Sequence, residues 1–586
     1  MKDWWNNAGL GMMVHFGVYS VLAGEYKGIK AKSTGEWIQS YFQIPNKDYT
    51  EIAKTFNPVN FDADQWMKTA SEAGIKFIVF TSKHHEGFCN FKTDYSDYSL
   101  WNYQKRDLVA ELAEACKKYD VKLCLYYSHC LDWHEKNGGG WLKPDLNYGM
   151  YWGNVWDFPN TEKKDFDIYL HEKSIPQIKE LLTNYGDISM MWFDCPMDMT
   201  PERAKIVYDT VKSIQPECMV NCRNCIDPYQ YSDFFGLSDN SVAGKISENK
   251  TESIITLNDT WGYNRHDLNW KSTDTVIDLL NKCASVNSNL SINVGPKADG
   301  TWPEETTEIF KGLAEWMAVN KESIHNNRAI AAPINCEDYL VTQKSNKIYI
   351  HFIKDVKNIE IVHIKSKVAS WKVLGNVYKA SFSQETEPDT GLSVIRISAE
   401  GKTKNTVIEL TFDETPQFVS EIIEQNDAIV LPTAHGKINV NGELNADIQK
   451  KIGAYGEVYD TKIEVDQQGC LVNWYDTANY ISWDFIAREK GKYKATLVTG
   501  AVYHMATWYG GHIVNINMND TKYPSYEVIN DGFIKEAGEI YKQAKTELGE
   551  IEIDKTGKNT LSLTASKLIK ENTPGLAVIK LILTKI

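Results

Sequence analysis

Hydrophobic positions in residues 1–330 follow two alternating patterns. Short apolar runs, typical of buried strands, are separated by longer stretches in which apolar residues recur three and four apart, typical of amphipathic helices. Strands are expected at 10–17, 76–82, 122–128, 188–194, 218–222, 232–238 and 290–295, and helices at 107–120, 171–186, 202–215 and 273–286. This alternation predicts βαβ units on a parallel sheet. Seven or eight such units favour an α/β fold of the (β/α)8-like (TIM) barrel type over an open doubly wound sheet.

The pattern changes after a helix expected at 303–324, where short strands separated by turn residues replace the alternation. We therefore expect three domains: a catalytic barrel at 1–330, a β-sandwich at 331–415 and a second β-sandwich at 416–586. The last domain carries aromatic residues that are either platforms for a glycan or ordinary core residues. These are Trp474, Tyr475, Trp483, Trp508 and Tyr509.

Charge, hydropathy and motifs argue against several classes of binding partner. The formal net charge is −15, whereas proteins that bind the phosphate backbone concentrate basic residues, so nucleic acid is not expected. No apolar run has the length of a membrane span, and no G-x-G-x-x-G loop follows the first expected strand. The chain opens without a signal-peptide pattern. It is expected to be periplasmic or secreted with its signal removed, or else cytoplasmic, and its oligomeric state is not predicted.

Most of the eleven cysteines lie in apolar runs, where a free thiol behaves as a small hydrophobe. Cys218, Cys222 and Cys225 are spaced closely enough to suggest a metal site, but the second pair of ligands that a structural zinc needs is not visible nearby. We predict neither a metal nor an organic cofactor.

Polar side chains close several of the expected strands. His15 closes the apolar run of the first strand, His84 and His85 follow the second strand, and Asp194 follows the apolar run at 188–193. Active sites of barrels lie at this carboxyl end of the strands. Asp194 suits a nucleophile that attacks an anomeric carbon, provided a second carboxyl group lies about 5 Å away. The alternative interpretation is a helix cap or a salt-bridge partner.

Several motifs of residues 1–330 resemble, in the same order, those of the α-L-fucosidase family, glycoside hydrolase family 29. The chain has MVHFGVYS at 13–20, GEW at 35–37, FDADQW at 61–66, SKHHEGF at 82–88, MWFD at 191–194, WGYN at 261–264 and SINVGPKADGTWP at 291–303. The resemblance implies a retaining exo-glycosidase that releases terminal α-L-fucose from a glycan or oligosaccharide.

The resemblance also assigns roles to residues. Asp194 is implied as the nucleophile and Glu252 as the acid/base, with Glu248 as its competitor four residues upstream. The residues implied to bind the sugar are His15, Glu36, Trp37, His84, His85, Trp192 and Trp261.

Two departures from the family pattern affect substrate preference. Phe16 stands where the family usually has Trp, and the stretch that often supplies a sugar-contacting Arg reads GLSDN at 236–240. One alternative function is therefore the same machinery acting on a related sugar of galactoside type. Another is a catalytically silent glycan-binding protein.

Overall fold

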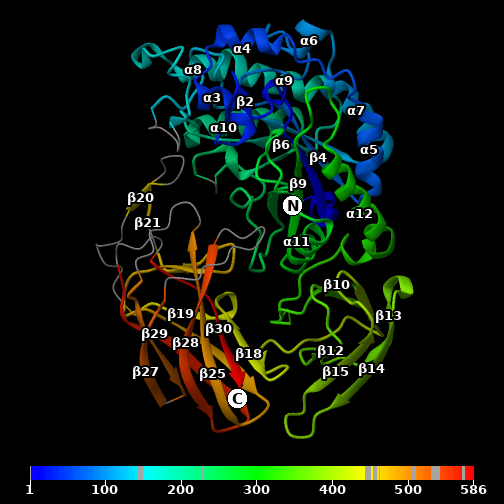
Figure 1. Ribbon diagram of the computed structural model, residues 1–586, viewed down its shortest axis with the longest axis vertical. Helices are drawn as coiled ribbons and strands as arrows, with labels where there is room; N and C mark the ends of the chain where they lie inside the picture. The colour runs from blue at the N-terminus through cyan, green and yellow to red at the C-terminus, as the bar shows by residue number, and fades with distance from the viewer. Residues whose placement is uncertain are drawn as a thin grey trace.

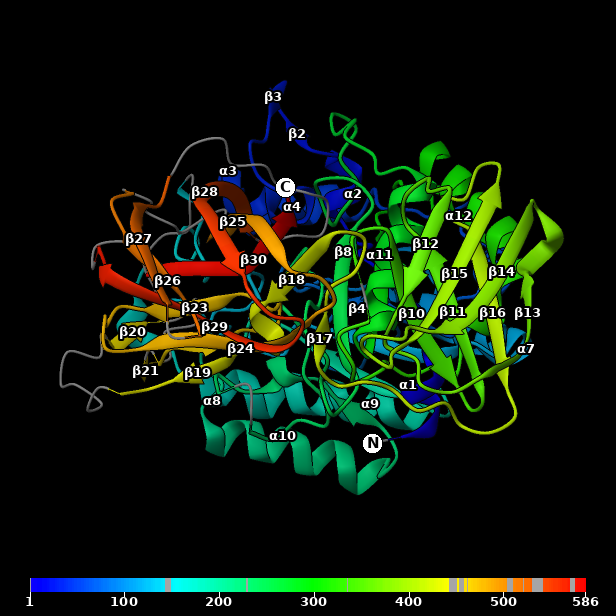
Figure 2. The same cartoon turned by 90° about the horizontal axis from the view of Figure 1, so that it is seen from below.

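A computed structural model describes residues 2–586 apart from 143–148, 228–229, 335, 442–449, 453–457, 461, 503–509, 520, 530–540 and 570–574. The N-terminal part, blue to green in Figure 1, combines helices with a parallel sheet. Two β-rich parts lie beside each other below it, one yellow-green and one orange to red. Figure 2 shows the same two parts side by side from below.

The N-terminal sheet has seven strands, and every neighbouring pair is parallel. Its strand order is β7-β6-β5-β4-β1-β9-β8. The strands are β1 (Leu10–Val14), β4 (Phe77–Lys83), β5 (Lys122–Tyr127), β6 (Met190–Phe193), β7 (Met219–Val220), β8 (Thr251–Thr256) and β9 (Ser288–Val294). Nearly all their residues are buried, as expected of a parallel sheet covered by helices.

Helices connect these strands and pack on one another around the sheet (Figure 1). Thus α10 contacts α9, α5 contacts α7 and α12, and α12 also contacts α11. The longer helices are α4 (Asn46–Ala53), α5 (Ala63–Glu72), α7 (Leu108–Tyr119), α9 (Ile175–Asn184), α10 (Pro201–Ile214), α11 (Thr273–Ser285) and α12 (Glu304–Asn320), and the shorter ones include α1 (Asp3–Ala8), α3 (Ile38–Phe42), α6 (Leu100–Gln104) and α8 (Phe166–Tyr169). Side-chain caps fix several starts: the Asp107 carboxylate accepts from Ala110 N at the start of α7.

One expected strand differs from the structure. Residues 232–238 form only isolated parallel bridges, Asn221↔Phe234 and Gly236↔Glu252. The seventh strand is instead β8, whose sequence TESIIT mixes polar and apolar residues although all six are buried. The pattern failed here because polar side chains inside the sheet find hydrogen-bond partners, so polarity did not indicate exposure.

The region after residue 330 consists of two groups of mainly antiparallel sheets. In the first group, a four-stranded and a three-stranded sheet share one hydrophobic cluster, which includes Val341, Ile350, Ile361 and Ile395. Its strands are β10 (Tyr339–Lys344), β11 (Lys347–Phe352), β16 (Val407–Phe412) and β13 (Val368–Val373), and β12 (Asn358–Ile361), β15 (Ser393–Glu400) and β14 (Lys379–Thr386).

In the second group, two six-stranded sheets share another cluster. One contains β17 (Ile422–Ile423), β19 (Lys437–Asn439), β24 (Tyr480–Ala487), β29 (Gly557–Lys567), β26 (Ile513–Met518) and β27 (Thr521–Glu527), and the other β18 (Ala428–Pro432), β22 (Glu464–Val465), β23 (Leu471–Trp474), β30 (Leu576–Lys585), β25 (Gly491–Val502) and β28 (Tyr541–Ile553). The domain limits at 330 and 415 stay predictions.

The aromatic residues of this last group differ in their exposure to solvent. Trp474 and Trp483 are buried members of the shared cluster, so they are core residues and not glycan platforms. Tyr475 is partly exposed. Trp508 and Tyr509 lie outside the described residues. Among the residues that the structure describes, no helix has the length and apolar character to cross a membrane.

We predict that Ile292→Ala, which removes a fully buried side chain of β9 beside Met12, lowers the free energy of unfolding by about 2–5 kcal/mol. Leu268→Ala is the control, because this leucine is 79% exposed and its loss should change stability by less than about 0.5 kcal/mol. Urea unfolding followed by tryptophan fluorescence measures both. Equal losses in the two variants would contradict this core assignment.

Candidate active site

Chemically active side chains gather where the parallel strands end. His15 follows β1, His84 and His85 follow β4, and Asp194 follows β6. Since all the strands run in one direction, their carboxyl ends lie at one edge of the sheet. The structure therefore brings together residues that are far apart in the chain.

Asp194 is the most fully supported carboxylate of this edge. Its Oδ1 accepts a hydrogen bond from Arg223 Nη1 at 2.9 Å and its Oδ2 accepts one from Tyr126 at 2.8 Å. His85 Nε2 lies 3.8 Å from Oδ2. Only 8% of Asp194 is exposed. Burial raises its pKa, but the charge of Arg223 and the hydrogen bonds from Arg223 and Tyr126 outweigh burial and hold the pKa below its usual value. Asp194 is thus an ionised carboxylate at neutral pH, held in a fixed orientation.

Arg223 links Asp194 to a second carboxylate. While Nη1 donates to Asp194, Nη2 donates to Asp239 Oδ1, and the guanidinium also lies 4.9 Å from the centre of the Trp192 ring. The Asp239 side chain is about half exposed, at 53%. A buried and an accessible carboxylate therefore share one cation.

Sequence reasoning missed both Arg223 and Asp239. Arg223 lies in CMVNCRNC, whose most conspicuous feature is its cysteines, and Asp239 lies in GLSDN, whose most conspicuous feature is the absence of the family's arginine. For Asp239 the available signal is the Asp-Asn pair, because both residues favour turns.

Glu252 lies elsewhere than its expected role requires. It belongs to β8 and is fully buried, and its two carboxylate oxygens accept hydrogen bonds from Trp192 Nε1 at 2.9 Å and from Ser291 Oγ at 2.7 Å. Burial raises its pKa. Glu248 is exposed but precedes the amino end of β8, whereas Asp194 follows the carboxyl end of β6. Neither position suits a group that must meet both substrate and water.

Three buried histidines form one aromatic cluster. Ring centres are 5.5 Å apart for His15 and His84 and 4.1 Å apart for His84 and His85. His15 Nδ1 bonds Asn293 Oδ1 at 2.7 Å and His85 Nδ1 bonds Ser128 Oγ at 2.7 Å. Burial lowers the pKa of all three, that of His85 to about 3. They are neutral imidazoles, suited to exchanging hydrogen bonds with hydroxyl groups.

Glu36, Trp37 and Trp261 come from connecting segments and lie against this cluster. Glu36 Oε2 accepts from Gly262 N at 2.9 Å, and burial raises the pKa of Glu36 to about 7. The Trp37 ring centre lies 5.1 Å from that of His85, and the Trp261 ring centre lies 5.3 Å from that of His15. Both indoles are partly exposed. They surround the histidines with flat apolar surface.

Trp192 was expected in the same group, and the structure places it in the sheet beneath. Its ring stacks on Tyr126 with centres 5.5 Å apart, and its indole nitrogen donates to Glu252. It is 3% exposed. Trp192 therefore supports Arg223 and Tyr126, the two residues that hold Asp194.

A buried ion cluster lies behind the histidine loop. Lys83 Nζ is 3.3 Å and Lys173 Nζ is 3.1 Å from Asp132 Oδ2, and Lys173 also reaches Glu135 at 2.9 Å. Lys83 and Asp132 are inaccessible to solvent. This cluster anchors the backbone that carries His84 and His85.

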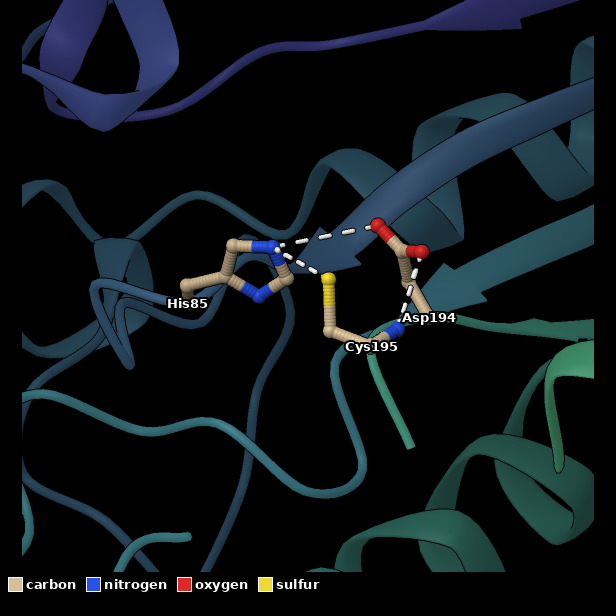
Figure 3. Close-up of side chains that lie close together, drawn as sticks. All are labelled: His85, Asp194 and Cys195. Carbon is tan, nitrogen blue, oxygen red and sulfur yellow. Dashed lines mark hydrogen bonds and ion pairs between the residues drawn. The ribbon is translucent and has the colours of Figure 1, made fainter. Parts of the chain in front are cut away.

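Among the described residues, one group of side chains could offer three donors to a metal ion: His85, Asp194 and Cys195 (Figure 3). Cys195 Sγ lies 3.5 Å from His85 Nε2. Arg223 already neutralises the Asp194 carboxylate, which weakens this group as a cation site. Cys218, Cys222 and Cys225 are buried free thiols that form no such group.

Known proteins resemble this chain over its N-terminal part and over its whole length. The family model described as Alpha-L-fucosidase matches residues 1–322. The crystal structure of an alpha-L-fucosidase from Vibrio sp. strain EJY3 superposes with a TM-score of 0.84 at 25% identity, covering 99% of this chain and 97% of that one. Alpha-L-fucosidase AlfC from Lactobacillus casei is 40% identical, with a TM-score of 0.51, over 53% of this chain and 96% of its own. Tissue alpha-L-fucosidase of Macaca fascicularis is 24% identical over 67% of this chain and 84% of its own.

We predict that Asp132→Asn lowers the free energy of unfolding by about 3–5 kcal/mol, because it leaves two buried ammonium groups without their shared anion. Asp167→Asn is the control, since Asp167 pairs with Arg203 at the surface and its loss should cost no more than about 1 kcal/mol. Chemical denaturation of the two variants measures the difference. If Asp132→Asn lowered the free energy of unfolding by no more than the control does, the ion cluster would not contribute to stability as predicted.

Proposed function

Because the chain belongs to the α-L-fucosidase family of glycoside hydrolases, we propose that it is a retaining exo-α-L-fucosidase with Asp194 as its nucleophile. One observation carries this proposal. Arg223 holds the buried Asp194 and the accessible Asp239 at one guanidinium, which supports a pair of carboxyl groups at the short separation that retention requires, about 5 Å.

In the first step the Asp194 carboxylate attacks the anomeric carbon of the terminal sugar and forms a glycosyl ester, while Asp239, which enters this step as a protonated carboxyl group, gives its proton to the leaving oxygen. In the second step Asp239 removes a proton from water, and the water oxygen attacks the anomeric carbon and releases Asp194. The hydrogen bonds from Arg223 and Tyr126 stabilise Asp194 as the departing carboxylate.

We assign the acid/base role to Asp239 instead of Glu252. A residue that protonates the leaving oxygen and then activates water needs access to both. Asp239 is half exposed, whereas Glu252 is fully buried with both oxygens occupied. Glu252 is a positioning residue that orients Trp192.

The sugar pocket of this proposal combines neutral donors and acceptors with aromatic surface. His84 belongs to the proposed sugar pocket because its neutral imidazole lies against those of His15 and His85. The other proposed sugar-binding residues are His15, Glu36, Trp37, His85 and Trp261. The number of groups converging on one point suits a single terminal sugar more than a long cleft. Two Lactobacillus casei AlfC structures are complexes with Fuca(1,6)GlcNAc and with 4-nitrophenyl-a-L-fucopyranoside, which supports a fucosylated substrate.

We also propose that the parallel sheet closes as a (β/α)8-type barrel. Strands β7 and β8 lie at opposite ends of the strand order, and Asn221, which follows β7, bridges to Phe234 while Glu252 of β8 bridges to Gly236. The registers define a path of paired residues that starts in β6 and crosses β7, residues 234–236, β8, β9, β1, β4 and β5. This path returns to β6 eight residues before the residue at which it started. A displacement of eight residues is the shear of TIM barrels. The flanking sheet groups as two sandwiches, and a periplasmic or secreted setting, stay predictions.

The test is hydrolysis of 4-nitrophenyl α-L-fucoside and the matching β-D-galactoside by the wild-type chain, Asp194→Ala, Asp239→Ala and Glu252→Gln. We expect fucoside turnover with α-L-fucose as the first product, background activity in Asp194→Ala and a loss of about 10²–10⁴-fold in Asp239→Ala. Azide should yield the α-fucosyl azide with Asp239→Ala and the β anomer with Asp194→Ala, because each replaces a different group.

Other outcomes redirect the proposal in distinct ways. Turnover of the galactoside alone would indicate a related sugar, and turnover of neither would favour a glycan-binding protein. An α-fucosyl azide from Glu252→Gln instead of Asp239→Ala would return the acid/base role to Glu252.

We predict that Arg223→Gln moves the acidic limb of the pH profile of kcat/KM to higher pH. Asp194 must be ionised to attack, so activity falls as the pH drops through its pKa, and removing the positive charge raises that pKa. Arg203→Gln is the control, because it removes an arginine that pairs with surface Asp167. An unmoved acidic limb in Arg223→Gln would show that Arg223 does not set the ionisation of Asp194.

A further inference from the structure

A hairpin of the last β group contacts the segment that carries Asp239. We call residues 237–247 the catalytic loop and residues 464–472 the docking hairpin. Gly244 N donates to Gln467 O at 3.0 Å, Lys245 Nζ donates to Val465 O, and Ser247 Oγ donates to Gln467 Oε1 at 3.3 Å. Three successive contacts thus join positions more than 200 residues apart.

The closest approach is between backbones. A Cβ added at Gly244 would lie 1.9 Å from Gln468 O, and a Cβ added at Gly469 would lie 2.7 Å from Gly244 O. Both distances are shorter than real Cβ contacts, and the opposing atoms are backbone atoms that cannot rotate away. Glycine on each side is therefore a requirement of this interface.

The docking hairpin is itself held firmly. Asp466 Oδ1 accepts hydrogen bonds from Gln468 N and Cys470 N, both at 2.9 Å, and Thr433 Oγ1 donates to Gly469 O at 2.6 Å. Its second strand, β23, pairs with β30 in the core of the β group. These hydrogen bonds and the strand pairing fix the hairpin on the β group.

The backbone of the catalytic loop reverses its direction at Asp239. Before the turn, Gly236 bridges Glu252 in parallel, and after it Ser241 bridges Ile254 in antiparallel sense. Asn240 Oδ1 ties the turn to β8 by accepting from Thr256 N at 2.8 Å. Residues 241–247, which follow the turn, contact β8 on one side and the docking hairpin on the other. The position of this segment along β8 therefore sets the position of Asp239.

We propose that the docking hairpin positions Asp239 for proton transfer, which makes the C-terminal β group a part of the catalytic unit. This inference rests on the proposed fucosidase activity with Asp239 as acid/base. Asp239 is the catalytic residue, and Gly244, Gly469 and Gln467 are positioning residues that act through the loop.

Leaving-group dependence tests this role. A fucoside with a poor leaving group, such as methyl α-L-fucoside, needs the proton from Asp239, whereas α-L-fucosyl fluoride departs with little assistance. In Gly244→Ala we expect kcat/KM for the methyl fucoside to fall at least about tenfold and that for the fluoride to change less than about twofold. Lys245→Ala, a milder change that removes one contact, should give the same selectivity with a smaller loss.

Gly312→Ala is the matched control. Its added Cβ would lie 2.7 Å from the Thr273 side chain on α11, which perturbs helix packing away from the loop. It should lower both rates equally or neither. The positioning role is overturned if Gly244→Ala and Lys245→Ala leave both rates unchanged, or lower both equally as a general loss of fold would. Failure of the fucosidase proposal is recognised separately, because then the wild-type chain hydrolyses neither fucoside.

Discussion

The ion pair between Arg223 and Asp194 is the interaction on which the site depends. Desolvation raises the pKa of the buried Asp194 carboxyl group, and the charge of the guanidinium opposes that effect. Because the same guanidinium also binds Asp239, one cation both ionises the proposed nucleophile and holds the proposed acid/base near it. Trp192 packs beneath the guanidinium and is itself oriented by Glu252, so the position of Arg223 is determined by the interior of the sheet.

The remaining side chains of the site are held by burial in the neutral state. His15, His84 and His85 have lowered pKa values and remain uncharged around Asp194, so they add no cation that would compete with Arg223. Asp132 keeps Lys83 paired below the same loop, which confines the local positive charge to the ion cluster. The site thus consists of the ion pair between Arg223 and Asp194, surrounded by neutral hydrogen-bonding groups. This arrangement suits a substrate that carries hydroxyl groups and no charge.

The last C-terminal β group is directly connected to the site. Two of the aromatic residues considered as glycan platforms, Trp474 and Trp483, are core residues. This β group contacts the segment that carries Asp239 through backbone atoms at Gly244 and Gly469 and through the side chains of Lys245 and Ser247. The close backbone approach joins segments far apart in the chain, so it leaves no pattern in the sequence.

The sequence by itself determined the parallel βαβ character of residues 1–330, the family, and the placing of His15, His84, His85 and Asp194 at strand ends, because these follow from local periodicity and from short ordered motifs. Only the tertiary structure decided that β8 is a strand, that Glu252 is buried within the sheet and that Asp239 shares Arg223 with Asp194. Those facts depend on contacts between segments that the chain separates, and buried polar residues of β8 look like an exposed loop until their partners are known.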